Sequence, residues 1–362
     1  MSAQEWFNLF VRGAHVLAAI LWIGDSFLFM WLDSKLTRPA QPREGDVVGE
    51  LWMAHSGGFY ELVKRRSLST LPKELFFFKW ESYSTWITGM LLLASAYWFG
   101  NRSMLVDGAA SVSQPVAVGI SVGLLALGTA VYHALCHTPL IRSVAAFGAV
   151  GLVAVTGLAA ALTDVFAPRA VWLQIGAMLG TIMTSNVFFV IVDAQRHMVA
   201  ATAAGTPVDT AYGTRAKQRS THNHYLTFPV LLAMLSNHYP GLYASPVAPL
   251  VLALVFLVAV GVKYAMSHRE QTPGWVAAGT VAALLAVIVA TRPTGAAAAV
   301  SLADVPTVPF ATAEAIVQTR CVSCHADHPT NPGFSAPPQG VALETPDAMR
   351  AHAERILQWA VT

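Results

Sequence analysis

The sequence predicts an all-α membrane protein: a polytopic bundle of about eight transmembrane helices and a small, incomplete helical domain at the C-terminus. Of the 362 residues, 55% are hydrophobic and only 12% are Asp, Glu, Lys or Arg, about half the charged fraction of soluble domains. The apolar residues also gather in long runs. This composition excludes a disordered chain and an ordinary soluble enzyme, and the net charge of +2 excludes a nucleic-acid-binding protein that relies on bulk charge.

Eight stretches are long and apolar enough to cross a bilayer, which takes about 20 residues for roughly 30 Å of hydrocarbon. They are residues 7–32, 82–100, 115–135, 144–163, 170–192, 222–238, 247–266 and 273–291. The sixth is the least apolar, because histidine and asparagine side chains occupy both of its ends. The first is too long for a signal peptide and lacks a basic leading region.

The basic residues indicate the orientation of the bundle. Fifteen of the 22 lysines and arginines fall in or beside the loops after spans one, three, five and seven, whereas the opposite loops contain Arg102, Arg169 and Arg292. Loops rich in Lys and Arg stay in the cytoplasm. We therefore expect both chain ends on the other side, which for a bacterial inner membrane is the periplasm.

The composition changes after the last span and divides the chain into three parts. Residues 1–291 form the predicted bundle, residues 292–310 are rich in Ala, Pro, Thr and Val and read as a linker, and residues 311–362 form a polar domain. Helices are expected at 313–320 and 346–359. The polar domain is expected in the periplasm.

The polar domain contains the strongest chemical signal, Cys321-Val-Ser-Cys324-His325. Two thiols at this spacing form thioethers to the vinyl groups of one haem c, and the adjacent histidine ligates the iron. A zinc half-site is the alternative, but the only other cysteine, Cys136, lies in the membrane part. The segment resembles a class I cytochrome c domain. The sequence stops 37 residues after His325 and the only later methionine is Met349, so we expect an incomplete domain whose distal iron ligand is unknown.

Two histidines of the bundle suit a haem b. His15 lies about 13 Å into the first span by helical rise, where an unpaired imidazole is costly, and small residues surround it in the sequence. His238 ends the sixth span, and we expect the two to be axial ligands of one haem b. A second haem b near His55 and His222 is left open. The remaining histidines of this part are read as ordinary interfacial residues: His133, His137, His197 and His268.

The predicted cytoplasmic side has many polar and aromatic residues that together suit a small planar anion. They supply positive charge, stacking faces and directional hydrogen bonds. The binding candidates are Lys79, Lys217, Arg219, Phe59, Trp80, His222 and Asn223. Glu81, His55 and Asp25 are candidate catalytic bases, and Asp25 qualifies because a carboxylate within a span is a functional candidate. The alternative is a solvated cytoplasmic rim without a site.

Several motifs give the chain a family resemblance that extends over almost its whole length. They are His55-Ser-Gly-Gly-Phe-Tyr60, Phe78-Lys-Trp-Glu81, Gly180-Thr-Ile-Met183, Asn186-Val-Phe-Phe189, Lys217-Gln-Arg-Ser220 and Ser236-Asn-His-Tyr-Pro240. The chain resembles the bacterial membrane-bound urate oxidases (urate hydroxylases) that carry a C-terminal cytochrome c domain. Ser56 departs from the family, where a glycine follows the histidine.

The resemblance implies a urate dehydrogenase in which urate becomes 5-hydroxyisourate without formation of hydrogen peroxide. Electrons are expected to pass through haem to a soluble cytochrome c or a terminal oxidase of the respiratory chain. If the substrate site is cytoplasmic, haem b is expected to relay electrons across the membrane. The expected partners are urate, such an electron acceptor and the lipid bilayer. A nucleic-acid partner is not expected, and the oligomeric state is left open.

Other functions remain open at this point. One is a different haem b oxidoreductase, acting on a quinol or a porphyrinogen. Another is a non-catalytic membrane-anchored cytochrome c that relays electrons. A urate or proton carrier is disfavoured, because the polar residues gather at the ends of the spans rather than at the midplane, where transporter sites lie.

Overall fold

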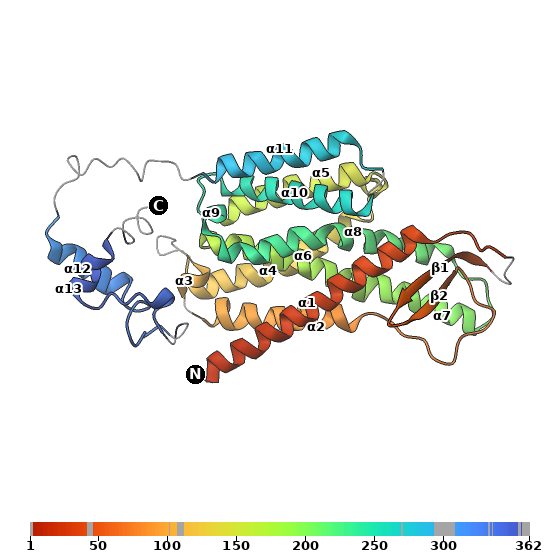
Figure 1. Ribbon diagram of the computed structural model, residues 1–362, viewed down its shortest axis with the longest axis horizontal. Coiled ribbons are helices and arrows are strands. Elements are labelled where there is room, and N and C mark those ends of the chain that lie inside the picture. Colours follow the sequence, from red (N-terminus) through yellow and green to blue (C-terminus); the bar gives the residue numbers. More distant parts are fainter. Residues whose placement is uncertain are drawn as a thin grey trace.

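The computed structural model describes residues 3–41, 46–100, 102–106, 112–268, 271–292, 308–331, 334, 336–353 and 356. Its long helices run side by side, and the start of the first helix lies at the same end of the bundle as the C-terminal helices (Figure 1). All eight predicted spans are helical. They correspond to α1 (Ala3–Lys35), α2 (Trp80–Leu93), α4 (Gln114–Leu135), α5 (Val144–Leu162), α6 (Pro168–Asn186), α8 (Thr210–Leu235), α10 (Ala248–Ser267) and α11 (Gly274–Ala290).

Within the described residues, five helices are long and apolar enough to cross a membrane. One of them is the continuous helix Pro168–Ala203, which contains α6, the π-helical turn η3 (Val187–Ile191) and α7 (Val192–Ala203). Helix α11 is apolar but shorter. The shorter elements of the bundle are η1 (Ala94–Trp98), α3 (Arg102–Leu105), η2 (Pro139–Arg142), η4 (Ser236–His238) and α9 (Pro240–Tyr243).

Helix α6 lies at the centre of the bundle. Its residues Trp172, Gln174 and Ile175 are at most 1% exposed, and it packs against α4, α8 and α2. Helices α1, α5 and α11 instead leave most of their apolar side chains exposed. Because lipid solvates apolar side chains as well as a protein core does, this difference separates one protein-buried helix from several that suit a lipid environment.

A β-hairpin in the first loop departs from the all-α prediction. Strand β1 (Val47–His55) pairs antiparallel with β2 (Gly58–Arg65). A two-residue turn joins them, with φ of +51° at Ser56 and +78° at Gly57, as a type I′ hairpin turn requires. From the sequence, this stretch was expected to be a basic cytoplasmic loop that carries the candidate site residues His55 and Phe59. The glycine-containing turn between two runs rich in apolar residues was the signal that could have predicted the hairpin.

Helix α8 also differs from the prediction, because it begins twelve residues before the sixth span, at Thr210. Asp209 caps it, its carboxylate accepting a hydrogen bond of 2.8 Å from the backbone N–H of Ala211. The motif Lys217–Ser220, expected in a loop, is therefore helical. Residues 219, 222 and 223 consequently fall on one face of α8, since positions three and four apart are neighbours on a helix.

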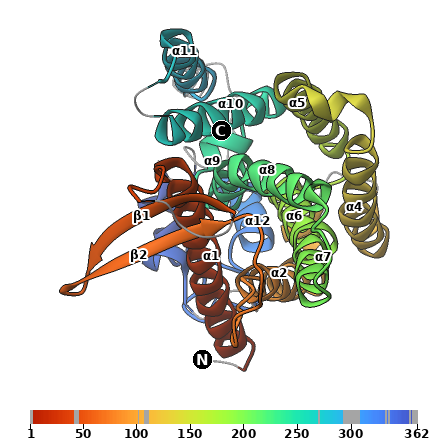
Figure 2. The same cartoon turned by 90° about the vertical axis from the view of Figure 1, so that its right-hand side faces the viewer.

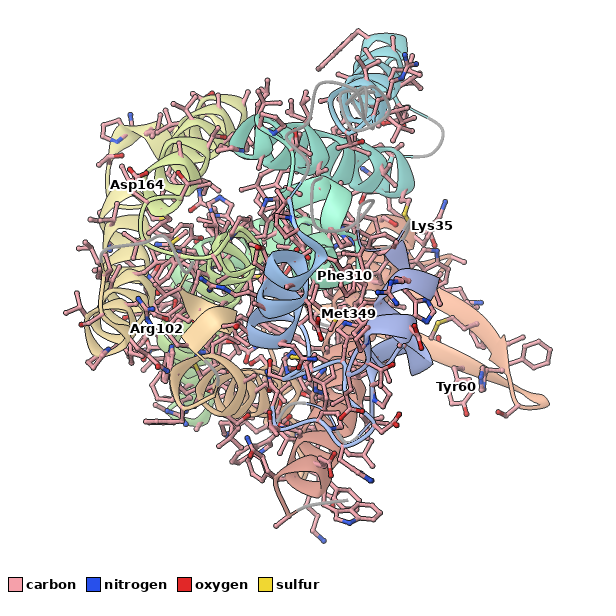
Figure 3. The ribbon with its side chains drawn as sticks, turned by 90° about the vertical axis from the view of Figure 1, so that its left-hand side faces the viewer. Lys35, Tyr60, Arg102, Asp164, Phe310 and Met349 are labelled. Carbon is pink, nitrogen blue, oxygen red and sulfur yellow. The ribbon has the colours of Figure 1, made fainter. Side chains whose placement is uncertain are left out.

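The C-terminal part contains α12 (Phe310–Arg320), η6 (Pro338–Gly340) and α13 (Pro346–Ala351). The first predicted helix is present, and the second is helical from Pro346 to Ala351, while its residues 354, 355 and 357–359 lie outside the described residues. A small apolar cluster joins them, formed by Val317, Leu343 and Met349. Figure 3 shows Phe310 of α12 and Met349 of α13 on neighbouring elements.

Candidate functional site

The inner face of α8 meets α4 and α6 in a network of buried and partly buried polar side chains, which we call the Tyr132 cluster: Tyr132, Asn186, Arg219, His222 and Asn223. Arg219, Asn223 and Asn186 are 5%, 6% and 0% exposed. Three different helices contribute, so the cluster exists only after the bundle has packed.

Tyr132 is the centre of this network. The Nδ2 group of Asn186 donates to the Tyr132 hydroxyl and to Oδ1 of Asn223, each at 2.9 Å. The Tyr132 hydroxyl lies 2.8 Å from Nδ1 of His222, and since this hydroxyl already accepts a hydrogen bond from Asn186, it is suited to donate to the imidazole. Nδ2 of Asn223 donates to the carbonyl of Met183 at 2.9 Å. These bonds fix the side chains that surround Arg219.

Two buried polar atoms of the cluster have no hydrogen-bond partner within the described residues, namely Nη1 of Arg219 and Oδ1 of Asn186. The Arg219 guanidinium lies 5.2 Å from the centre of the Tyr132 ring. An unpartnered buried donor on a charged group is costly. Arg219 is therefore positioned to receive an acceptor atom from a ligand.

A cavity of about 300 Å³ opens in front of Arg219, between α4, η3, α7 and α8. This volume is at the lower end of small-molecule pockets, which span ~300–1,000 Å³. Its walls are formed by His133, Cys136, His137, Phe189, Val190, Asp193, Ala194, Tyr212, Arg215, Gln218 and Arg219. The π-helical turn η3 contributes Phe189 and Val190 to the wall, and single π-turns inside α-helices frequently mark functional sites.

The cavity is cationic and partly aromatic. Arg215 and Arg219 lie one helical turn apart on α8, and the Arg215 guanidinium lies 4.7 Å from the centre of the Tyr212 ring. Asp193 contributes a carboxylate to the wall, which lies 3.5 Å from Nδ1 of His197. Two guanidinium groups, the Gln218 amide and the rings of Phe189 and Tyr212 suit a small planar anion that has hydrogen-bonding groups at its edge.

Of the predicted binding residues, the structure brings Arg219, His222 and Asn223 together in the Tyr132 cluster. Lys217 points elsewhere: its ammonium lies 3.5 Å from Asp33 of α1, and its side chain is 69% exposed. Lys79 and Trp80 lie at the start of α2, where the Lys79 ammonium is 5.8 Å from the centre of the Trp80 ring. None of these three residues lines the cavity.

The three predicted bases also lie outside the cavity wall. Asp25 of α1 and Glu81 of α2 interact electrostatically with each other. His55 lies at the exposed tip of the hairpin, with its Nδ1 2.6 Å from the Ser56 hydroxyl. Phe59, the remaining predicted binding residue, is 84% exposed on the same tip.

The contribution of α4 was not predicted from the sequence. His133 and His137, read as interfacial histidines, line the cavity together with Cys136, and Nε2 of His133 lies 3.0 Å from the Ser185 hydroxyl. The available signal was the run Tyr132-His133-Ala-Leu-Cys136-His137, which places its polar residues within about two turns at the end of an apolar helix. Its side chains face α6 and α8 only because these helices pack there.

The residues around the Cys-Val-Ser-Cys-His motif fit a covalently held haem. Cys321 ends α12, and its carbonyl accepts hydrogen bonds from the backbone N–H groups of Cys324 and His325, at 3.1 and 2.8 Å. Both thiols are free. Nδ1 of His325 is 2.9 Å from the carbonyl of Val341, an arrangement that holds an iron-ligating imidazole in place and leaves Nε2 for the metal.

The surroundings of this motif are apolar. Cys321, Val322 and Val341 pack against the cluster of Val317, Leu343 and Met349. Burial raises the pKa of the Cys321 thiol, and the neighbouring Cys324 raises it further. Within the described residues, no group of three His, Cys, Asp or Glu side chains could hold a metal ion on its own.

The two histidines predicted for haem b differ in their surroundings. Nδ1 of His15 lies 3.0 Å from both the Thr85 carbonyl and the Thr88 hydroxyl of α2, so its ring is held as an axial ligand would be. His238 is exposed in η4, after the end of α8. His15 fits one side of a haem, and the pairing with His238 stays a prediction.

Fold and cavity together define a polytopic helical membrane protein with a cationic cavity at one end of its bundle, where Arg219 is buried and Arg215 is exposed. The family model of the urate oxidase N-terminal domain matches residues 1–292. The chain therefore belongs to the urate oxidase N-terminal family, which supports an oxidoreductase that acts on urate. No curated protein and no solved structure matches the chain.

Proposed function

We propose that this protein oxidises urate to 5-hydroxyisourate at the cytoplasmic side of the bacterial inner membrane and passes the electrons through haem to the respiratory chain. The observation that carries the proposal is Arg219, which is buried at the cavity wall with an Nη1 that has no partner among the described residues. Membership in the family supplies the substrate class.

Urate is a planar monoanion at neutral pH, with carbonyl oxygens that accept and ring N–H groups that donate hydrogen bonds. The free Nη1 of Arg219 would bind its anionic edge, and the Gln218 amide would bind a neighbouring carbonyl or N–H group. The rings of Phe189 and Tyr212 offer stacking faces. Recognition thus rests on charge-assisted hydrogen bonds within an aromatic slot.

The reaction converts urate and one water into 5-hydroxyisourate, two protons and two electrons. The protons need acceptors at the cavity, and His133 and Asp193 are titratable side chains of the wall that suit general base catalysis. Nε2 of His133 is engaged with Ser185, so its Nδ1 remains for this role. The other members of the Tyr132 cluster hold Arg219 in place and are not part of the cavity wall.

The electrons leave one at a time because haem is a one-electron carrier. Haem c would be attached to Cys321 and Cys324 with His325 as its proximal ligand, and it would hand electrons to a soluble cytochrome c or a terminal oxidase. His15 is the residue that best fits a haem b within the bundle. Since the proposed reaction consumes no oxygen at the cavity, it forms no hydrogen peroxide.

The proposal is tested by adding urate to the purified protein without oxygen and recording its haem absorption. Urate should reduce the haem in the wild-type protein and in Arg196→Met, whose arginine is exposed on α7 away from the cavity wall. At a urate concentration that just saturates the wild-type protein, Arg219→Met should lose most of the reduction, while dithionite reduces all three proteins. Haem that dithionite reduces and urate does not, in the wild-type protein, would rule out the proposal.

A further inference from the structure

The hairpin β1–β2 carries the residues of the His55–Tyr60 motif, which the proposed urate site does not use. Its exposed aromatic side chains, here called the hairpin tip, are Trp52, Phe59 and Tyr60, which are 60%, 84% and 53% exposed. Trp52 is on the same sheet face as Phe59, while Tyr60 is on the opposite face, as the strand register dictates. Exposed apolar side chains gathered in one place mark a site of interaction with a protein or a membrane.

The hairpin extends away from the cavity. Figure 2, which looks along the bundle, shows it stretched across the end of the helices and projecting beyond α1, on the side opposite α7 and α4. Figure 3, from the other end, shows Tyr60 on this projecting arm, well clear of the helices. The tip is therefore not a lid over the cavity of its own chain.

The base of the hairpin is fixed to the rest of the protein. Thr37 and Glu50 exchange two backbone hydrogen bonds of 2.9 and 3.0 Å, and Lys64 forms an ion pair with Asp33 at the end of α1. Gly49 allows the close approach, because a Cβ there would lie 2.9 Å from both Leu36 Cβ and the Thr37 carbonyl oxygen. The arm is thus held in a defined direction.

The hairpin tip continues a belt of exposed aromatic residues at this end of the bundle. Trp31, Phe78 and Trp80 are 46%, 54% and 65% exposed, and the rings of Phe29 and Phe78 are 4.9 Å apart. Basic residues follow directly at the base of the hairpin: Lys64, Arg65 and Arg66. Aromatic side chains beside Lys and Arg at the ends of spanning helices are typical of the membrane–water interface.

The exposed area argues against a second copy of the chain as the partner. An aromatic side chain buries about 150–250 Å² at most, and the three of the hairpin tip are only partly exposed. Together they fall short of the ~800 Å² per partner that a stable protein interface needs. A lipid surface has no such minimum, because each side chain partitions into it separately.

From these observations we infer that the hairpin lies along the bilayer and inserts its tip, with Phe59 foremost, into the phospholipid headgroup region of the leaflet next to the cavity. The arm runs across the direction of the helices, as a segment parallel to the membrane must. This lipid contact is independent of the proposed reaction with urate.

The test places an environment-sensitive fluorophore on Phe59→Cys and, as a control, on Thr206→Cys in the exposed loop between α7 and α8, with the protein in nanodiscs. The native cysteines are the same in both variants, so their background cancels. Lipids with a spin label near the headgroup should quench the probe at 59 at least threefold more than the probe at 206. Iodide, which stays in the water, should quench the probe at 206 more strongly than the probe at 59.

Two results would overturn the inference. Equal quenching by lipid and equal access to iodide at both positions would place the tip in water. Protection from iodide that appears only in nanodiscs holding two copies, without quenching by lipid, would assign the tip to a second copy. Quenching measurements on Trp52→Cys repeat the test at another position of the tip, should Phe59→Cys fail to assemble.

Discussion

The inner face of α8 and the hairpin tip both present residues that suit binding of an aromatic anion, but their environments are opposite. Arg219 and Asn223 are buried beside side chains of α4 and α6. Oδ1 of Asn223 accepts a hydrogen bond from Asn186, and Nη1 of Arg219 has no partner among the described residues. His55 and Phe59 instead project from an exposed arm. Residue type alone therefore does not define a site, because a charged group binds strongly only where it is desolvated and held in place.

The contrast between a buried and an exposed binding candidate is tested most directly by Arg219 and Lys217, two cations that lie two residues apart on α8. Arg219→Met should weaken urate binding about 10–150-fold, since a hydrogen bond to a charged group is worth about 1.5–3 kcal/mol. Lys217→Met should weaken it less than about 3-fold, because that ammonium is exposed and pairs with Asp33. Anaerobic calorimetric titration with urate measures both. Equal losses would place Lys217 in the site as well.

Tyr132 tests whether the buried cluster positions Arg219. Tyr132→Phe keeps the ring beneath the guanidinium but removes the hydroxyl that contacts Asn186 and His222. Each lost hydrogen bond costs about 0.5–1.5 kcal/mol, so the midpoint of thermal unfolding should fall by several degrees and urate affinity by about 3–10-fold. A fall in stability with unchanged affinity would limit Tyr132 to a structural role.

The hairpin turn provides a matched pair of glycines. Gly57 has φ +78°, whereas Gly58 is outside the left-handed region and has open space, with no atom within 4 Å, where a side chain would begin. Gly57→Val should destabilise the hairpin by about 1–2 kcal/mol, and trypsin should cleave at Lys64 faster than in Gly58→Val. Urate affinity should change less than twofold in both variants, which calorimetry checks. A large loss of affinity in Gly57→Val would link the hairpin to the cavity.

The smallest expected effect concerns the thiols of the C-terminal part in haem-free protein. Because burial and Cys324 raise the pKa of Cys321, less of it is thiolate at pH 7.5 than of an ordinary cysteine, and thiolate is the reactive form. Alkylation of Cys321 by iodoacetamide should therefore be slow at pH 7.5 and accelerate about tenfold per pH unit above it. Peptide mass spectrometry follows Cys321 and Cys324 separately. A rate independent of pH would contradict the raised pKa.

Much of the architecture follows from local sequence patterns. A run of about 20 apolar residues must satisfy its backbone within a helix when it crosses lipid. The residues of the eight predicted spans are indeed helical, and five helices of the described part are long and apolar enough to cross a membrane. The Cys321-Val-Ser-Cys324-His325 motif is equally local, since the three residues proposed to hold haem c lie within five consecutive positions. The start of α8 was missed because its first three turns are polar, and polar sequence at the end of a span resembles a loop.

The structure brings together only some of the residues proposed for the site, and the reason is geometric. Arg219, His222 and Asn223 are neighbours because they lie close together in sequence on one helix, whereas Lys79, Trp80 and Phe59 were grouped with them only by residue type and predicted side of the membrane. Tyr132, His133 and Cys136 reach the same place from α4, 80 or more residues earlier. A local sequence pattern does not predict which helices pack against one another.

The helical bundle, its apolar spans and the Cys-Val-Ser-Cys-His motif can be read from the sequence, because hydrophobicity and short spacing act along the chain. That α4, η3, α7 and α8 line a cationic cavity, while the hairpin points away from it, follows from the packing of the helices. Packing brings residues distant in sequence into contact and excludes water from them. Those two effects, and not the residue types alone, separate Arg219 from Lys217.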